Sequence, residues 1–362
     1  MTSPDILVIG GGMITHDQIL PSLLHLKRTG KIASIEVCAT RRSTIEALGR
    51  AFPGGDFTGF AGDYRSRIAA LRERSIVFIA TPDQLHREMA MAALEANQHV
   101  ICVKPLALKL AHAREIEAAA RARGLFVGIE YHKRFDDRSL MARRRYREGA
   151  FGEFRLGHAC LLEKAYYLKS NFQNWFTCEN SDAFTYIGCH YVDLVAFITG
   201  LTPAAVSLHA IKDRFPNGNE GYLWTDARVL WSNGACLNVQ NALNFPDAAP
   251  GTNTQGLTMY CDGGLIDHSD QYRGLKYSYK NGAYAEPSPD YFQMVEWEGP
   301  GLRPAGYGYR SIEALVEACK EGPGSLLATP ANSSYNEGAI EAARESLRLG
   351  GALIPVPSLQ AI

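Results

Sequence analysis

Short apolar runs alternate with helical patterns through the first 130 residues, and this alternation restricts the fold more than any other feature. The apolar runs occupy residues 5–9, 35–39, 75–80, 99–103 and 125–130, and the helical patterns occupy 19–26, 43–52, 84–96 and 109–123. Strands that alternate with helices in this way form a parallel sheet with crossover helices. We therefore predict an α/β protein whose first domain is a doubly wound parallel sheet.

Three consecutive glycines, Gly10 to Gly12, follow the first predicted strand directly. Glycine permits a tight turn and lets backbone amides approach a pyrophosphate at the start of the next helix. Thr15 stands where the third glycine of a G-x-G-x-x-G pattern would be, so the match is partial. Because the strand, the glycine turn and the helix come in the right order, we predict a Rossmann nucleotide-binding domain.

Ligands of a doubly wound sheet bind beyond the carboxyl ends of its strands. The residues that we predict to bind the cofactor at this edge are Gly10, Gly12, Met13, Ile14, Thr40, Arg41, Arg42, Thr81, Pro82, His86, Lys104 and Pro105. His86 also has a structural interpretation, because it lies on the helix after Thr81-Pro82. The second strand ends in Thr40-Arg41-Arg42, without the acid that binds the ribose 2′-hydroxyl of NAD. The cofactor is therefore NAD or NADP, with NADP favoured, although an arginine can also stack on the adenine of NAD.

Residues 182–200 predict a buried helix that also carries titratable side chains. The apolar residues at spacings of three and four are Ile187, Tyr191, Leu194, Val195 and Ile198, and they predict a buried face. Tyr186, His190 and Asp193 form a polar stripe on the same segment, which Gly200 ends. A histidine bonded to the aspartate one turn on would explain this stripe without any function, so the helix alone leaves both interpretations open.

Several short motifs, in order along the chain, resemble the Gfo/Idh/MocA oxidoreductases, the family of glucose–fructose oxidoreductase and the inositol dehydrogenases. These motifs are Thr81-Pro82 with His86, Val103-Lys104-Pro105-Leu106, Arg134-Phe135, Gly188-Cys189-His190 with Asp193, and the closing helix 338–350 with its LIPVP tail. The resemblance implies a Rossmann domain over residues 1–130. It also implies an α+β domain over residues 131–362 with a large open, mostly antiparallel sheet and a C-terminal segment that packs back toward the first domain.

Alternating apolar residues at 155–161, 204–211, 227–231, 235–241 and 258–261 agree with the strands of such a sheet. Open sheet faces often serve as subunit contacts, so the resemblance also implies a homo-oligomer, either a dimer or a tetramer.

The resemblance assigns the catalytic pair to Lys104 and His190. A histidine suits a general base near neutral pH, and a lysine stabilises negative charge on a substrate oxygen. Asp193 could orient the imidazole ring. Two acids that are common in the family are replaced here: Val103 precedes the lysine, and Tyr186 stands four residues before the histidine.

Further candidates lie around this pair. Tyr131 and His132 leave the last predicted strand at the ligand edge and are candidate catalytic groups. The candidate substrate contacts are Arg134, Lys164, Tyr166, Lys169 and Arg273. Such basic clusters are usually solvated surface. If they line the pocket, they favour an anionic sugar, for example a sulfosugar or a uronide.

The leading functional prediction is an NAD(P)-dependent dehydrogenase of a sugar, a sugar derivative or a polyol. The alternative is an NAD-dependent glycoside hydrolase that works by transient oxidation, elimination, water addition and re-reduction. This mechanism needs a second base, for which Tyr186, Tyr131 and His132 are candidates. A cofactor-binding sensor without activity ranks last, because it would be expected to lack the lysine or the histidine.

Composition excludes other classes of protein. The formal net charge of −1 gives no general attraction to nucleic acid, and no apolar run approaches the length of a membrane helix. The N-terminus lacks the basic region of a signal peptide, so we expect a cytoplasmic protein. The 8 cysteines include no C-x-x-C pair, which indicates free thiols and no metal site.

Overall fold

The computed structural model describes residues 3–248, 253–270 and 273–357, and the chain separates into two compact units. The first unit contains residues 1–107, 111–132 and 291–332. The second contains residues 108–110, 133–290 and 333–362. Residues 291–332 thus belong to the first unit, although they follow most of the second unit in the sequence.

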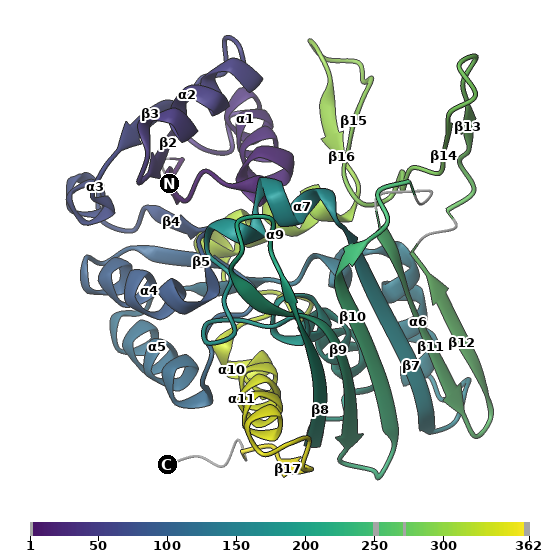
Figure 1. Ribbon diagram of the computed structural model, residues 1–362. Helices are drawn as coiled ribbons and strands as arrows, with labels where there is room; N and C mark the ends of the chain where they lie inside the picture. The colour runs from purple at the N-terminus through teal and green to yellow at the C-terminus, as the bar shows by residue number, and fades with distance from the viewer. Residues whose placement is uncertain (1–2, 249–252, 271–272, 358–362) are drawn as a thin grey trace. The chain divides into compact units, whose positions relative to one another are not determined.

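The first unit is built on a six-stranded parallel sheet with the strand order β3-β2-β1-β4-β5-β6 (Figure 1). Its strands are β1 (Asp5–Ile9), β2 (Ser34–Ala39), β3 (Thr58–Ala61), β4 (Ile76–Ile79), β5 (His99–Val103) and β6 (Val127–Glu130). Its helices are α1 (Leu20–Arg28), α2 (Arg42–Ala51), α3 (Tyr64–Ala70), α4 (His86–Glu95), α5 (Leu110–Arg123) and α9 (Tyr307–Glu321). A short hairpin, β15 (Gln293–Val295) with β16 (Arg303–Ala305), precedes α9. The predicted doubly wound fold is confirmed.

The sequence analysis missed β3 and α3. Three of the four residues of β3 are exposed, so this edge strand lacks the apolar run that marks β1, β4 and β5. Those three strands are buried along nearly their whole length, as expected for a parallel sheet covered on both faces. Their carboxyl ends present the turns that begin at Gly10, Ala80 and Lys104, and these turns position the candidate cofactor residues.

The second unit is built on a seven-stranded sheet with the strand order β12-β11-β7-β10-β9-β8-β17. Its strands are β7 (Phe154–Lys164), β8 (Pro203–Arg214), β9 (Glu220–Trp231), β10 (Cys236–Phe245), β11 (Asn253–Cys261), β12 (Gly264–Ser269) and β17 (Ile354–Pro355). Strands β10 and β7 pair in parallel, and the other recorded pairs are antiparallel, so the predicted mostly antiparallel sheet is confirmed. The hairpin β13 (Tyr277–Ser278) with β14 (Tyr284–Ala285) extends from this unit.

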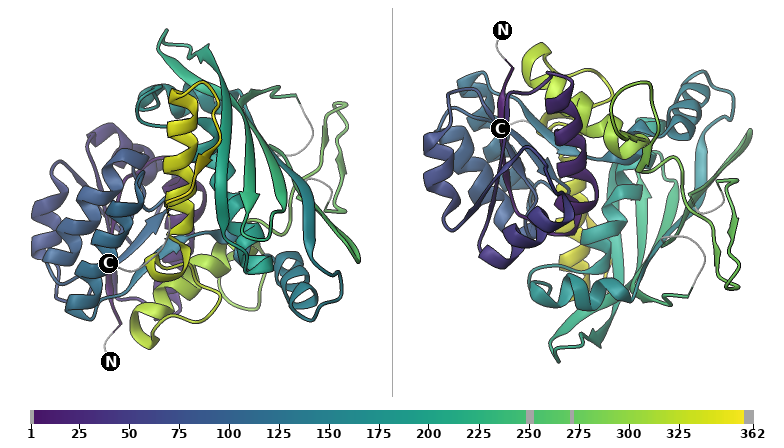
Figure 2. Two further views of the ribbon diagram at one scale, coloured as in Figure 1. Left: turned by 90° about the horizontal axis from the view of Figure 1, so that it is seen from below. Right: turned by 90° about the horizontal axis from the view of Figure 1, so that it is seen from above.

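One face of this sheet is covered by helices. Along β9 the buried residues alternate with exposed or half-buried ones, which is the pattern of a sheet with one covered face. Helix α11 (Tyr335–Arg348) runs along β8 on the covered side, where Leu208 N donates to Ser346 Oγ at 2.9 Å (Figure 2). Helices α6 (Asp137–Arg147) and α8 (Cys189–Thr199) pack against each other. The opposite face exposes Leu156, Ile211, Tyr260 and Leu265.

The helix expected over residues 182–200 begins with a π-helical turn, Phe184–Gly188, which continues into α8. The Asp182 carboxylate starts this segment by accepting from Thr185 N at 2.8 Å and from Thr185 Oγ1 at 2.7 Å. Gly200 ends it in the left-handed region, with a φ of 82°. Every residue of α8 is buried, so the expected apolar face describes only part of a helix that is enclosed all round.

None of the helices in the described ranges has both the length and the apolar content needed to cross a membrane.

Candidate functional site

The glycine turn after β1 has the geometry that a dinucleotide requires. Gly10 has a φ of 108°, and a Cβ there would lie 2.0 Å from the carbonyl oxygen of Ala80, so only glycine fits. At Gly12 a Cβ would meet no atom within 4 Å, so this part of the turn faces open space that a ligand can enter. The residues present therefore fit a bound dinucleotide.

Thr15 replaces the missing third glycine with a hydrogen bond. Its side chain is fully buried, and its Oγ1 donates to the carbonyl oxygen of Gly10 at 2.7 Å. Thr15 is the first residue of a π-helical turn, Thr15–Ile19, which leads into α1. The hydroxyl thus ties the helix start to the turn, so the departure from the glycine pattern is compensated locally.

The remaining predicted cofactor residues differ in exposure. Thr40, Arg41 and Arg42 are exposed beyond β2, whereas Met13, Ile14, Thr81, Pro82 and Lys104 are half-buried and Pro105 is buried. Arg41 and Arg42 therefore have the freedom to meet a ligand at the end of β2. The peptide bond between Lys104 and Pro105 is cis.

His86 is fully buried and contacts two turns of the ligand edge. Its Nδ1 lies 2.7 Å from the carbonyl oxygen of Pro105, and its Nε2 lies 2.7 Å from the carbonyl oxygen of Thr81. With both ring nitrogens directed at backbone carbonyls, this geometry does not support the direct cofactor contact that we predicted for His86. It instead connects the turns that follow β4 and β5.

Tyr131 and His132 follow β6. Tyr131 is buried, and His132 Nδ1 lies 3.1 Å from Glu130 Oε2. The other carboxylate oxygen of Glu130 accepts from Gln18 Nε2 at 3.0 Å and from Ser311 Oγ at 2.7 Å. The His132 ring also stacks on Tyr307 at 5.6 Å between ring centres. This environment holds the His132 ring in one orientation.

The predicted base, His190, is 4% exposed on α8. Tyr186 precedes it by four residues and is half-buried in the π-helical turn. Both residues lie on one continuous helical segment. The π-helical turn that contains Tyr186 was missed, and no local sequence signal marks it.

Asp193 is paired with Arg134. The Asp193 carboxylate accepts from Arg134 Nε at 2.7 Å and from Arg134 Nη2 at 2.5 Å, and the Tyr335 hydroxyl lies 3.1 Å from it. Arg134 also donates to Ser333 Oγ at 2.8 Å. Arg134 and Asp193 are both at least nine-tenths buried. Burial and the Asp193 charge raise the pKa of Tyr335. This network does not support Arg134 as a substrate contact or Asp193 as the group that orients the His190 ring.

A second buried charge network was not anticipated from the sequence. Lys133 Nζ donates to Gln255 Oε1 at 2.6 Å and to Asp270 Oδ2 at 2.5 Å. Burial, followed by the charge of Arg273, lowers the pKa of Lys133 to about 7. Arg273 binds Asp270, Asp136 at 2.8 Å and Asp290 at 3.0 Å, and its side chain has no exposed surface. Arg273 therefore does not have the position expected of a substrate contact.

Asp136, His268 and Asp270 offer ligand atoms within 4.8 Å of one another, which is a possible metal geometry. Arg273 binds both carboxylates, however, and so supplies the positive charge that a metal ion would bring. Burial opposes ionisation of Asp136, but the His268 hydrogen bond and the Arg273 charge hold its pKa well below the usual value. These residues form a structural ion network.

The other candidate substrate residues lie near the end of β7. Lys164 is half-buried as the last residue of β7, whereas Tyr166 and Lys169 are exposed on α7 (Tyr166–Ser170). The three residues are close in sequence, but Arg273 belongs to the ion network described above.

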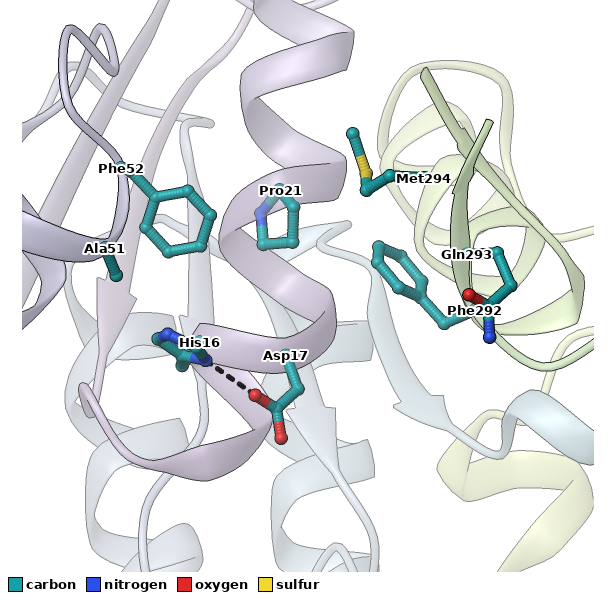
Figure 3. A pocket seen from close by; sticks show the side chains of 8 residues that line it. All are labelled: His16, Asp17, Pro21, Ala51, Phe52, Phe292, Gln293 and Met294. Atoms are coloured by element: carbon teal, nitrogen blue, oxygen red, sulfur yellow. Dashed lines mark hydrogen bonds and ion pairs between the residues drawn. The ribbon is translucent and has the colours of Figure 1, made fainter. Parts of the chain in front are cut away.

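A groove of about 440 Å³ opens on the first unit (Figure 3). It is lined by His16, Asp17, Pro21, Ala51, Phe52, Phe292, Gln293 and Met294. His16 Nδ1 lies 2.6 Å from Asp17 Oδ1, and both side chains are about half exposed. The groove is shallow and formed mostly by apolar side chains from α1, the end of α2 and β15 (Figure 3).

Comparison with known protein families decides the class of the first unit. Residues 5–131 match the Gfo/Idh/MocA family model, described as an oxidoreductase family with an NAD-binding Rossmann fold. This match confirms the resemblance that the sequence motifs indicated.

Curated relatives match this chain over part of its length. The 1,5-anhydro-D-fructose reductase of Ensifer adhaerens is 35% identical over 151 residues, which are 40% of this chain and 43% of the relative. The D-glucoside 3-dehydrogenase of Escherichia coli K12 is 25% identical over 210 residues, which are 57% and 56% of the two chains. The chain thus spans about half the length of these curated relatives.

Structural similarity extends over the whole chain. GenD2 from gentamicin A biosynthesis, solved in complex with NAD, superimposes with a TM-score of 0.77 at 17% identity, covering 99% of this chain and 97% of GenD2. At this identity the likeness establishes a shared fold. The second unit therefore shares the fold of the corresponding part of GenD2.

Proposed function

We propose that this protein is an NAD(P)-dependent oxidoreductase that transfers hydride at a carbinol carbon of a sugar, a sugar derivative or a polyol. The observation that carries this proposal is the family match of residues 5–131, whose glycine turn leaves open space at Gly12. The names of the relatives support a carbohydrate substrate, because one is a reductase and the other a dehydrogenase of sugar compounds.

The residues that hold the cofactor in this proposal are Gly10, Gly12, Met13 and Ile14 at the pyrophosphate, Arg41 and Arg42 at the adenosine end, and Thr81 and Lys104 toward the nicotinamide. When bound, the nicotinamide accepts the hydride that leaves the substrate carbon. NADP is favoured over NAD because exposed arginines stand where an NAD-binding chain has an acid.

His190 acts as the general base in this proposal and takes the proton of the substrate hydroxyl. Its 4% exposure limits the contact of the ring with bulk water. Lys104 has the role that the resemblance assigns to it, which is to stabilise negative charge on a substrate oxygen. In the reverse direction, His190 returns the proton to the carbonyl oxygen.

Asp193 and Arg134 have a positioning role in this proposal. Their bidentate ion pair holds α8 to the turn after β6 and to the start of α11 through Tyr335. Tyr186 presents a phenol where the family commonly has an acid, so it contributes a neutral hydrogen-bonding group near the base.

The test combines both nicotinamide cofactors with a panel of free sugars, polyols and aryl glycosides, including anionic ones. Absorbance of the reduced nicotinamide and release of the aglycone are followed in the same cuvette. We expect net NAD(P)H formation with at least one free sugar or polyol. His190→Gln should lower kcat by roughly 10²- to 10⁴-fold, the usual contribution of a general base. His209→Gln, an exposed histidine on β8, is the matched control and should leave kcat unchanged.

Two outcomes would overturn the proposal. Cofactor-dependent aglycone release without net NAD(P)H would identify the redox glycoside hydrolase instead. Full activity of the His190→Gln variant would show that His190 is not the general base, and the assigned mechanism would then be wrong.

A further inference from the structure

Aromatic rings gather beside the helix that carries His190, and the mechanism proposed above uses only one of them. Seven rings of the second unit form a connected cluster: Tyr166, Tyr167, Phe172, Trp175, Phe176, Tyr186 and Phe215. Six of them belong to the segment from α7 to the π-helical turn, and Phe215 follows β8. The cluster is therefore built mostly by the chain that immediately precedes α8.

Tyr186 is the point where this cluster meets the candidate site. Its ring lies 5.1 Å from the ring of Phe172 in an edge-on contact and 5.7 Å from the ring of Trp175. Tyr186 is four residues before His190 on one helical segment. The rings of Phe172 and Trp175 therefore contact the stripe residue that precedes the proposed base by one helical turn.

The cluster has an inner and an outer layer. Phe172 and Phe176 have no exposed surface and form the inner layer, where their rings are 6.1 Å apart. Trp175 and Tyr186 are half-buried and form the outer layer. Because each outer ring packs against Phe172 or Phe176, the inner layer fixes the orientation of the rings that remain accessible.

The backbone at Trp175 is also held in place. Trp175 N donates to the carbonyl oxygen of Phe172 at 3.1 Å, and its own carbonyl oxygen accepts from Asn180 Nδ2. Asn180 Oδ1 in turn accepts from Thr177 N at 2.7 Å. A half-buried tryptophan that is fixed by its main chain and by an apolar layer is a preorganised contact surface.

We propose that Trp175, with Tyr186, forms a stacking surface for the ring of the substrate, which makes the preferred substrate a cyclic sugar such as a pyranoside. This inference rests on the proposed function and names its substrate class. One face of a pyranose ring carries mostly axial C–H groups, and such a face packs on a flat aromatic ring while the hydroxyls keep polar partners. An open-chain alditol with the same hydroxyls has no rigid apolar face and gains little from this surface.

The test uses tryptophan fluorescence and steady-state kinetics with the full-length protein. The chain has 4 tryptophans, so Trp175→Phe and the control Trp224→Phe separate the signal of one residue from the rest. Trp224 is also half-buried in the second unit, but it lies on β9 and donates to Asp213 Oδ2 at 3.4 Å. The ligands are methyl glucopyranosides, myo-inositol as a second ring compound, and sorbitol as the open-chain counterpart.

We expect the pyranosides to change the fluorescence of the wild-type protein and of Trp224→Phe, and not that of Trp175→Phe. Trp175→Ala should raise KM for ring compounds about tenfold while kcat changes little, and Trp175→Phe should restore most of the loss. KM for sorbitol should change by much less. Specific loss of ring binding with rescue by another aromatic residue is a result that simple destabilisation does not give.

Failure of this inference and failure of the proposed function give different results. If wild-type protein turns over a pyranoside and Trp175→Ala has an unchanged KM, the stacking surface is wrong and the function stands. If pyranosides change Trp175 fluorescence but no compound in the panel is oxidised, the surface stands and the oxidoreductase proposal fails. A wild-type protein whose fluorescence responds to no ring compound, or equally to sorbitol, overturns the inference.

Discussion

The ligand edge of the first unit and helix α8 of the second unit present their polar residues in opposite ways. At the edge, Thr40, Arg41 and Arg42 follow a buried strand and are exposed. On α8, His190 and Asp193 are buried, and Asp193 is already bound to Arg134. A polar residue just after a parallel strand therefore tends to remain accessible. A polar residue on an enclosed helix needs a partner that only the tertiary structure supplies.

Removing one member of the buried pair is the strongest way to test this difference. Asp193→Ala leaves the Arg134 guanidinium buried without its carboxylate, which should lower the free energy of unfolding by about 3–5 kcal/mol. Denaturant unfolding followed by circular dichroism measures the change. Asp226→Ala, an exposed position on β9, is the control and should change stability by less than about 0.5 kcal/mol. A loss below about 1 kcal/mol for Asp193→Ala would mean that the pair does not hold α8 in place.

The same contrast explains which elements and contacts could be predicted from the sequence. The strands β1, β2, β4 and β5 were placed within a residue or so because apolar runs between turns carry their own signal. The helix over residues 182–200 was found from its period. Its partners Arg134 and Tyr335 were not, because they lie 59 and 142 positions away in the chain and no local pattern links them to Asp193.

The candidate site also contains residues that a local pattern predicts and residues that only the tertiary structure brings together. Gly10 and Thr15 occupy a turn whose residues are consecutive, so the sequence showed both the turn and its departure from the glycine pattern. The ion network of Lys133, Asp136 and Arg273 joins segments more than 130 residues apart. From the sequence, Arg273 was therefore interpreted as a cation at the surface. Only the fold shows that it is buried and balances the charges of Asp136 and Asp270.

The two units should also respond differently to acid. His99, the first residue of β5, is 3% exposed, and its Nδ1 accepts from Phe126 N at 2.9 Å, which requires the neutral ring. Burial, followed by the charge of Arg74, lowers the pKa of His99 to about 4. The unfolded chain takes up this proton near pH 6.5, so folded-state stability falls as the pH drops from about 6.5 to 4.

The expected loss over this window is about 3 kcal/mol, measured by denaturant unfolding at a series of pH values. His99→Asn keeps an acceptor for Phe126 N but cannot titrate. The free energy of unfolding of this variant should therefore change across that window only through other titratable groups, which the wild-type protein also has. In the second unit, the lowered pKa of Asp136 contributes stability that is lost only at pH values below the usual aspartate pKa. An unaltered slope in His99→Asn would contradict the assignment of the first window to His99.

The accessibility of the ligand edge has a smaller but more specific consequence. If Arg41 binds the 2′-phosphate of NADP, Arg41→Ala should lower kcat/KM for NADP about tenfold, because a hydrogen bond to a charged group is lost. The value for NAD should hardly change. Arg50→Ala, an exposed arginine near the end of α2, is the matched control. Equal losses with both cofactors would show that Arg41 stacks on the adenine, and a stronger loss with NAD would contradict the favoured use of NADP.

Thr15 on the ligand edge resembles the polar residues of the buried helix, because its side chain is bound to a neighbouring group of the protein. Thr15→Val keeps the branched shape but removes the hydrogen bond to the Gly10 carbonyl, at an expected cost of about 1 kcal/mol in stability. Thr15→Ser keeps the hydroxyl and should lose less. Since the bond fixes the turn that receives the cofactor, Thr15→Val should also raise the Kd for NAD(P), measured by calorimetry. A Kd that stays constant while stability falls would show that the hydroxyl supports the start of the helix and leaves the shape of the glycine turn unaffected.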